Sequence, residues 1–379
     1  MNQSQSVPVD TGSRLSMTQH LSGLGGLALW SLRAHLLLLL LPVTFLALSN
    51  TLTADLVDPQ RASFLALARG LLFISLPAAL VAMFFVRLGQ YALIIKPESA
   101  FRQLGTDIRY LAATPRLWIN ALPVVVAMII HNKAAIELKA SIPALNPFSW
   151  DQAFIDLDRL LHFGTDPWRL LQPVLGLPYV TFAINIAYNF WFVLMFGLWF
   201  WFAFQDRHSQ LRDRFFLAFS LAWLVGGGIM ALAFSSAGPV YLANLGFADN
   251  PYTDLMAYLH KVHTEVIPLW ALDAQQMLWD GYTKPDVDFL GISAFPSMHN
   301  AIVTVFACAA WSINRTFGKL ITAYAAIILV GSVHLGWHYA VDGYAGIILG
   351  LACWHVAGHV ARWHERQPWV EAYRARLHG

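Results

Sequence analysis

The feature that most constrains this chain is a series of long apolar runs separated by polar segments. A membrane-spanning helix needs roughly 20 mostly apolar residues. Hydrophobic residues make up 57% of the 379 residues and charged residues 12%, whereas soluble domains carry about 25% charged residues. We therefore expect an all-α fold, a polytopic membrane helix bundle with about eight transmembrane helices. The expected helices cover residues 28–50, 66–87, 117–136, 178–203, 214–235, 298–313, 319–337 and 341–361.

The charges of the loops orient this bundle, because Lys and Arg favour cytoplasmic loops. With eight helices, the N-terminus and four segments rich in Arg and Lys, one of which is the C-terminal tail, fall on one side, which we expect to be cytoplasmic. The long 236–297 loop falls on the other side and carries seven acidic residues against Lys261 and Lys284. We expect an integral membrane protein of a bacterial inner membrane with both termini cytoplasmic. The net charge of +2 gives no indication of nucleic-acid binding.

Two short histidine motifs lie at the ends of neighbouring apolar runs. The first is Pro296-Ser297-Met298-His299, and the second is His338-Tyr339-Ala340-Val341-Asp342. His299 begins the sixth expected helix and His338 follows the seventh, after only a short hairpin turn. Both motifs should therefore meet on the same, extracytoplasmic face of the membrane.

The residue types in these motifs suit phosphoryl transfer through a histidine. His338 and Asp342 are four residues apart, so they share a helix face. A carboxylate bonded to one ring nitrogen fixes the tautomer and leaves the other nitrogen free to attack. His299 follows Ser297 at an expected helix start, where free N–H groups suit a bound phosphate. We expect His338 to be the nucleophile, Asp342 to orient it, and His299 to act as general acid and then base.

These stretches resemble the second and third signature motifs of the type 2 phosphatidic acid phosphatase superfamily. In that family the motifs read roughly Pro-Ser-Gly-His and Ser-Arg-x5-His-x3-Asp. Here Met298 replaces the glycine, and Gly331-Ser332 occupies the Ser-Arg position, so the arginine is missing. The family's first motif, Lys-x6-Arg-Pro, has no clean counterpart in this chain. These differences from the family motifs argue against an ordinary lipid phosphatase of the family.

Phe295-Pro296-Ser297-Met298-His299 is more similar to one branch, the inositol phosphorylceramide synthases (the aureobasidin-resistance group). Residues 156–159 and 162–169 look like the first-motif region of that branch, and residues 236–239 resemble its next loop. The resemblance covers roughly residues 115–360. It implies a six-helix phosphatase-like core and transfer of a phospho-headgroup between membrane lipids on the non-cytosolic leaflet, without a metal or other cofactor.

The domain division follows from this resemblance. We expect a cytoplasmic disordered tail at 1–22, N-terminal membrane helices and a cytoplasmic loop at 23–110, and a cytoplasmic tail at 363–379. The phosphatidic acid phosphatase-like catalytic membrane domain covers residues 111–362. Membrane lipids are the expected partners, as donor and acceptor, and the oligomeric state stays open.

Cations must replace the missing arginine motif, because phosphoryl transfer spreads negative charge over the equatorial oxygens. We expect Arg159 and Arg169 to bind substrate in this role, together with the hydroxyl of Ser297. The alternative is that both arginines anchor helix ends at lipid headgroups. Asp158 is expected to bind a substrate hydroxyl or to pair with Arg159.

His334 is expected to line the cleft. Alternatively, His334, His338 and Asp342 form one helical stripe with ligand types found in zinc sites. In the fourth helix, Asn185, Tyr188 and Asn189 either shape a headgroup cavity or make interhelical hydrogen bonds.

Two other functions remain open at this point. If water is the acceptor, the same site is a lipid phosphate phosphatase. A non-catalytic lipid-binding or transport protein with a degenerate site is the third possibility, which the loss of the arginine motif supports.

Overall fold

The computed structural model describes residues 17–54, 56, 64–91, 95–284 and 291–378, which form helices and no strands. Seven helical segments in this part of the chain are long and apolar enough to cross a membrane, and an eighth apolar helix is shorter. The expected polytopic helical bundle is therefore confirmed. The seven spans are Leu36–Thr53, Ala68–Leu88, Pro115–Leu145, Pro178–Ala203, Gln210–Ala233, Arg315–His334 and Ala340–Glu365, and the shorter helix is Met298–Ile313.

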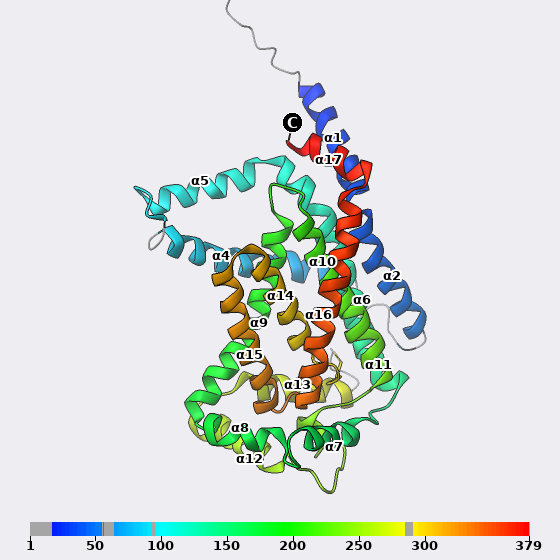
Figure 1. The fold of residues 1–379 in the computed structure, drawn as a ribbon, viewed down its shortest axis with the longest axis vertical. Helices are drawn as coiled ribbons and strands as arrows, with labels where there is room; N and C mark the ends of the chain where they lie inside the picture. Colours follow the sequence, from blue (N-terminus) through cyan, green and yellow to red (C-terminus); the bar gives the residue numbers. More distant parts are fainter. Residues whose placement is uncertain (1–16, 55, 57–63, 92–94, 285–290, 379) are drawn as a thin grey trace, which may run out of the picture.

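The spans correspond to helices that succeed one another along the chain (Figure 1). The N-terminal helices are α1 (Met17–Ala34), α2 (Leu36–Thr53), α3 (Phe64–Gly70), α4 (Leu76–Gln90), α5 (Ala100–Ala113) and α6 (Pro115–Leu145). Next come α7 (Asp151–Leu161), α8 (Pro167–Leu175), α9 (Pro178–Ala203), α10 (Gln210–Ala222), α11 (Ala231–Ala233), α12 (Thr253–Lys261) and α13 (Trp270–Thr283). The last are α14 (Met298–Ile313), α15 (Arg315–His334), α16 (Ala340–Glu365) and α17 (Pro368–His378). A π-helical turn, Trp223–Met230, joins α10 to α11, and another, Leu71–Ser75, joins α3 to α4.

Local sequence signals define where these helices begin. Asn314 precedes α15, and its side chain accepts the N–H of Phe317 over 2.8 Å. Such caps satisfy N–H groups that lack partners within the helix. Prolines stand in the first turn of α6 and α9, where their missing N–H costs nothing.

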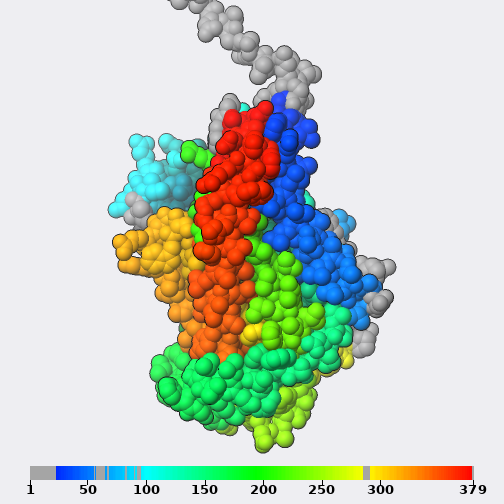
Figure 2. Space-filling model, turned by 45° about the vertical axis from the view of Figure 1, so that its right-hand side comes forward, coloured from blue at the N-terminus to red at the C-terminus, as the bar shows by residue number. Residues whose placement is uncertain are grey.

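The two described ends of the chain meet at the upper end of the bundle in Figure 1. α1 packs against α17 through buried Leu27, Ala34, Tyr373 and Leu377, and Figure 2 shows the red C-terminal helix beside the blue N-terminal one. Residues 1–16 lie outside the described residues, so most of the expected N-terminal tail is not described. The expected C-terminal tail contains the helix α17.

The opposite end of the bundle is covered by helices that run across it. Figure 1 shows α7, α8, α12 and α13 lying across the lower end, while α9, α14, α15 and α16 stand upright above them. α14 has 16 residues, which makes it about 24 Å long, shorter than the roughly 30 Å hydrocarbon layer. Since α14 begins at the first histidine motif, this motif is recessed from the end of the bundle.

Candidate active site

The two histidine motifs lie side by side. The N–H of Ser297 donates to the backbone oxygen of Asp342 over 2.9 Å, which joins the residue before α14 to the first turn of α16. A Cβ at Gly346 would stand 2.5 Å from the backbone oxygen of Ser297. The close approach of α14 and α16 therefore sets the spacing between the motifs.

His338 and Asp342 are bonded to each other, with 3.3 Å between Nδ1 of His338 and Oδ2 of Asp342. The same oxygen accepts the N–H of Tyr339 over 3.0 Å, and the carboxylate is fully buried. His338 lies in the turn between α15 and α16. Burial, and next the charge of Lys139, lower the pKa of His338 to about 3, so its ring is neutral at pH 7. Asp342 contacts Nδ1, so Nε2 is the nitrogen that we expect to react. The ring also interacts with the backbone of Ala294, which opposes the lowering of its pKa.

His299 is held by aromatic side chains of α9. Its ring stacks on Tyr188 with 4.5 Å between ring centroids and packs against Trp191 at 4.3 Å. The indole N–H of Trp191 also donates to the backbone oxygen of His299 over 3.2 Å. Nε2 of His299 is buried without a hydrogen-bond partner among the described residues. The ring is thus fixed in position while one nitrogen stays available to a ligand.

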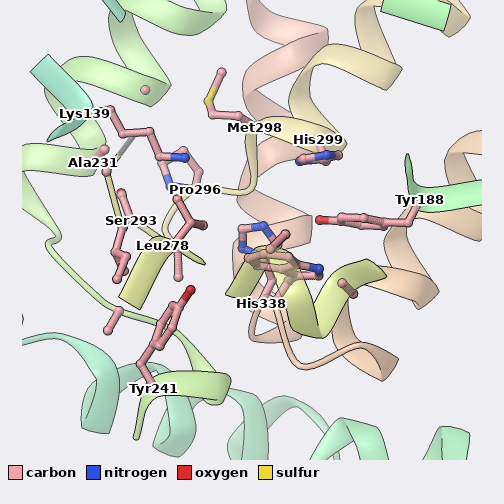
Figure 3. A pocket seen from close by; sticks show the side chains of 18 of the residues that line it. Lys139, Tyr188, Ala231, Tyr241, Leu278, Ser293, Pro296, Met298, His299 and His338 are labelled. Atoms are coloured by element: carbon pink, nitrogen blue, oxygen red, sulfur yellow. The ribbon is translucent and has the colours of Figure 1, made fainter. Parts of the chain in front are cut away.

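Both histidines line one cavity of about 300 Å³. Figure 3 shows His338 between two groups, with His299 and Tyr188 on one side and Lys139 on the other. Most of the remaining lining is apolar and comes from α9, α13 and the segment just before α14. The cavity can therefore present two imidazoles and one ammonium group to a single ligand.

Two carboxylates of α7 hold the segment that carries His338. Asp158 accepts the backbone N–H groups of residues 340 and 341 over 2.8 and 2.9 Å, so it caps α16 from a neighbouring helix. Asp151 accepts the hydroxyl of Tyr339 over 2.8 Å. Burial raises the pKa of Asp158 to about 6, although the two N–H donors oppose this shift. Asp158 does not line the cavity, so it acts on the site through the backbone of α16.

The two arginines expected at the substrate lie outside the lining of the cavity. Nε of Arg159 lies 2.7 Å from Oδ1 of Asp166. Arg169 lies 3.5 Å from the other oxygen of Asp166 and 3.3 Å from a carboxylate oxygen of Asp254. Asp166 thus holds both guanidinium groups where α7 turns into α8.

Ser297 and His334 do not line the cavity either, and both contact neighbouring side chains. Ser297 is fully buried, and its hydroxyl accepts a hydrogen bond from Nδ2 of Asn300 over 3.0 Å. Nε2 of His334 lies 2.9 Å from the hydroxyl of Thr181. Within the described part of the chain, no group of three His, Cys, Asp or Glu side chains is placed to hold a metal ion. The alternative zinc stripe is therefore not assembled there.

The sequence reasoning missed Lys139, the cation that does line the cavity. The expected third helix ended at residue 136, whereas α6 continues to Leu145 and carries Lys139 on its last turns. A lysine three residues beyond an apolar run was the available signal. Of the three side chains considered for a headgroup cavity, Tyr188 and Asn189 line it, and Asn185 accepts the N–H of Ala271 over 3.0 Å.

Fold and site together define a polytopic helical membrane protein with two histidines in one cavity. A family model described as the PAP2 superfamily matches residues 152–356, more than half of the chain, and the chain belongs to this superfamily. The match includes His299, His338 and Asp342 and excludes Lys139. No curated protein and no solved structure matches the chain.

Proposed function

We propose that this protein is a membrane lipid phosphotransferase that moves a phospho-headgroup between lipids through a phosphohistidine at His338. One observation carries the proposal: His338 and His299 line the same cavity, and Asp342 is hydrogen-bonded to Nδ1 of His338. Membership of the PAP2 superfamily supports the same class of chemistry.

In the first step, Nε2 of His338 attacks the phosphorus of the donor lipid. A P–N bond forms, the bond between phosphorus and the leaving oxygen breaks, and His299 gives that oxygen a proton. Asp342 stabilises the charge that develops on the ring of His338. The products are a lipid alcohol and a phosphorylated histidine.

In the second step, the hydroxyl of an acceptor lipid attacks the same phosphorus. Its proton passes to His299, the P–N bond breaks, and His338 returns to its neutral form. The mostly apolar lining of the cavity favours a lipid alcohol over water as acceptor. The resemblance to inositol phosphorylceramide synthases favours a sphingolipid acceptor.

The rim of the cavity supports a lipid substrate. Phe192 and Met277 line the cavity and are 47% and 49% exposed. Phe192 belongs to the membrane span α9, so a lipid in the bilayer can enter the cavity beside it and reach the histidines.

The proposed location is a bacterial inner membrane, with the histidine cavity on the extracytoplasmic side and both termini in the cytoplasm. The concentration of Arg and Lys in the short loops and the C-terminal tail on the side of the termini supports this orientation.

Lipid turnover by purified full-length protein in mixed-lipid vesicles tests the proposal. Mass spectrometry should find the headgroup on a second lipid, and His338→Ala should lower turnover at least about 10³-fold, because the nucleophile is lost. His260→Ala, a change to an exposed histidine, is the control and should leave turnover unchanged.

The other outcomes separate the alternatives. Headgroup phosphate released to water alone would identify a phosphatase. Absence of turnover in the wild-type protein would support a lipid-binding or transport protein. Undiminished turnover in a folded His338→Ala variant would rule out the histidine mechanism.

A further inference from the structure

Lys139 brings a positive charge into the cavity from outside the segment that defines the family. It lies on α6, and the family match begins at residue 152. Figure 3 shows it across the cavity from His299 and Tyr188, with His338 between them. Lys139 is the one Lys or Arg side chain among the described residues that line the cavity, so it supplies the positive charge that a ligand there would meet.

The ammonium group of Lys139 has no hydrogen bond and no ion pair within the described residues, unlike three other cations. Lys133 on the same helix pairs with Glu137, Lys284 lies 3.0 Å from a carboxylate oxygen of Asp280, and Arg159 is held by Asp166. A half-buried charge without a counterion is costly. The ammonium group of Lys139 therefore favours a ligand that brings negative charge into the cavity.

Other polar groups around the cavity also lack partners. The indole nitrogens of Trp223 and Trp337 and Nε2 of His299 are buried without a hydrogen-bond partner among the described residues, and all three side chains line this cavity. A buried donor left unpaired costs about 1–3 kcal/mol. Indole N–H groups only donate, so these groups and the ammonium group call for a ligand rich in acceptor oxygens.

The position of Lys139 is fixed by a close backbone contact. Gly291 has φ +89°, and a Cβ there would stand 2.5 Å from the backbone carbon and oxygen of Lys139. A glycine is therefore required where the chain leading to the first histidine motif crosses α6. This contact ties the lysine to the segment that positions His299.

We propose that Lys139 binds the phosphate group of the lipid substrate, with its unpaired ammonium group supplying positive charge to the cavity. The inference rests on the proposed function, and it identifies the ligand of this subsite as a phosphate ester. An ammonium group acts as a compact point charge on phosphate oxygens. Charge placed beside those oxygens stabilises the transition state, in which negative charge spreads over them.

Steady-state kinetics of full-length Lys139→Met and Lys139→Arg variants in lipid vesicles test the inference. Lys139→Met should lower kcat/KM about 10²–10³-fold, the range for losing one stabilising group, and Lys139→Arg should recover at least about tenfold of that loss. Lys284→Met is the matched control: it removes an exposed lysine paired with Asp280 and should change kcat/KM less than about twofold. A folded Lys139→Met variant with wild-type kcat/KM would overturn the inference.

A binding measurement separates this inference from the proposed function. Inorganic phosphate and orthovanadate should raise the thermal unfolding midpoint of detergent-solubilised wild-type protein and of His338→Ala, but not of Lys139→Met. If Lys139→Met does not fold, Lys139→Gln takes its place. If the ligands also raise the midpoint of Lys139→Met, the inference is contradicted. It is equally contradicted if they do not raise the midpoint of the wild type. Stabilisation lost with Lys139 in a protein without lipid turnover would support the phosphate subsite while contradicting the proposed transferase.

Discussion

At residue scale, Asp158 holds the start of α16 without lining the cavity. Its carboxylate accepts two backbone N–H groups in the first turn of α16, and the proposed nucleophile His338 lies next to Tyr339, the N-cap residue of that helix. Burial raises the pKa of this carboxyl to about 6. The sequence analysis expected Asp158 to bind a substrate hydroxyl or to pair with Arg159. It did not predict the cap on α16, because a cap supplied from a different helix leaves no pattern along the chain.

The raised pKa gives a pH dependence of stability with a definite sign. An unfolded Asp titrates near about 3.9, so the folded protein holds this proton more tightly than the unfolded chain. The stabilising contribution of Asp158 is complete below about pH 3.9 and is lost as pH rises through about 6. Thermal unfolding in detergent measures this. As pH rises from 4 to 7, the unfolding midpoint of the wild type should fall relative to that of Asp158→Asn. A constant or rising difference would contradict this assignment.

The cations of the site illustrate the limits of sequence reasoning at this scale. Arg159 and Arg169 were expected at the substrate because they lie in the resembling segment, yet both pair with Asp166. Lys139 reaches the cavity only because α6 packs against the chain at Gly291. The choice between these cations depends on tertiary contacts, which residue type and spacing do not encode.

At the scale of elements, the site depends on how closely α14 and α16 approach. Gly346 and Gly350 on α16 face the backbone of α14, where added Cβ atoms would stand 2.5 Å and 2.4 Å from the oxygens of Ser297 and Ala301. Backbone atoms cannot move aside as a flexible side chain can. The two glycines therefore fix the distance between the helices that carry His299 and Asp342.

Gly346→Ala should push the two helices apart. The strain should cost about 1–3 kcal/mol of stability, and a displacement of about 1 Å at the histidines should lower lipid turnover by as much as about 10²-fold. Thermal unfolding and turnover of the purified variant measure both effects. Gly197→Ala in α9 is the control, because no atom lies within 4 Å of the added Cβ. It should keep full turnover, so equal behaviour of the two variants would show that the glycine contact does not set the site.

The helices themselves were largely predictable from the sequence. Apolar runs located each span, and 178–203 and 298–313 match α9 and α14 in both bounds. The π-helical turn at Trp223–Met230 and the helices α7, α8, α12 and α13 were not predicted. These short helices lack the length that makes a membrane span recognisable.

At the scale of the whole molecule, helices far apart in the sequence line one cavity. α6 contributes Lys139, α9 contributes Tyr188, α14 contributes His299, and His338 precedes α16. The hairpin between the last two motifs predicted that the histidines share a face. Tyr188 of α9 was one of the side chains expected at a headgroup cavity, with interhelical hydrogen bonding as the alternative. The contribution of α6 was not predicted, because nothing in its sequence specifies which helices become its neighbours.

At the opposite end of the bundle, a buried arginine connects several helices. Arg212 is fully buried, and its guanidinium donates to the backbone oxygens of Asn120 and Phe202 over 2.6 and 3.0 Å. His35 Nε2 lies 2.7 Å from the same group. These contacts join α6, α9 and α10 to the start of α2, so the bundle is fixed at the end away from the histidines.

The most direct test of the central claim is to locate the phosphorylated residue by mass spectrometry. A His299→Ala variant should be supplied with p-nitrophenyl phosphate, whose leaving group needs no proton, so that the second step alone is blocked. We predict phosphate on a nitrogen of His338 in this variant and none in the His299→Ala, His338→Ala double variant. Phosphate on another residue, or equal labelling of the double variant, would contradict the account.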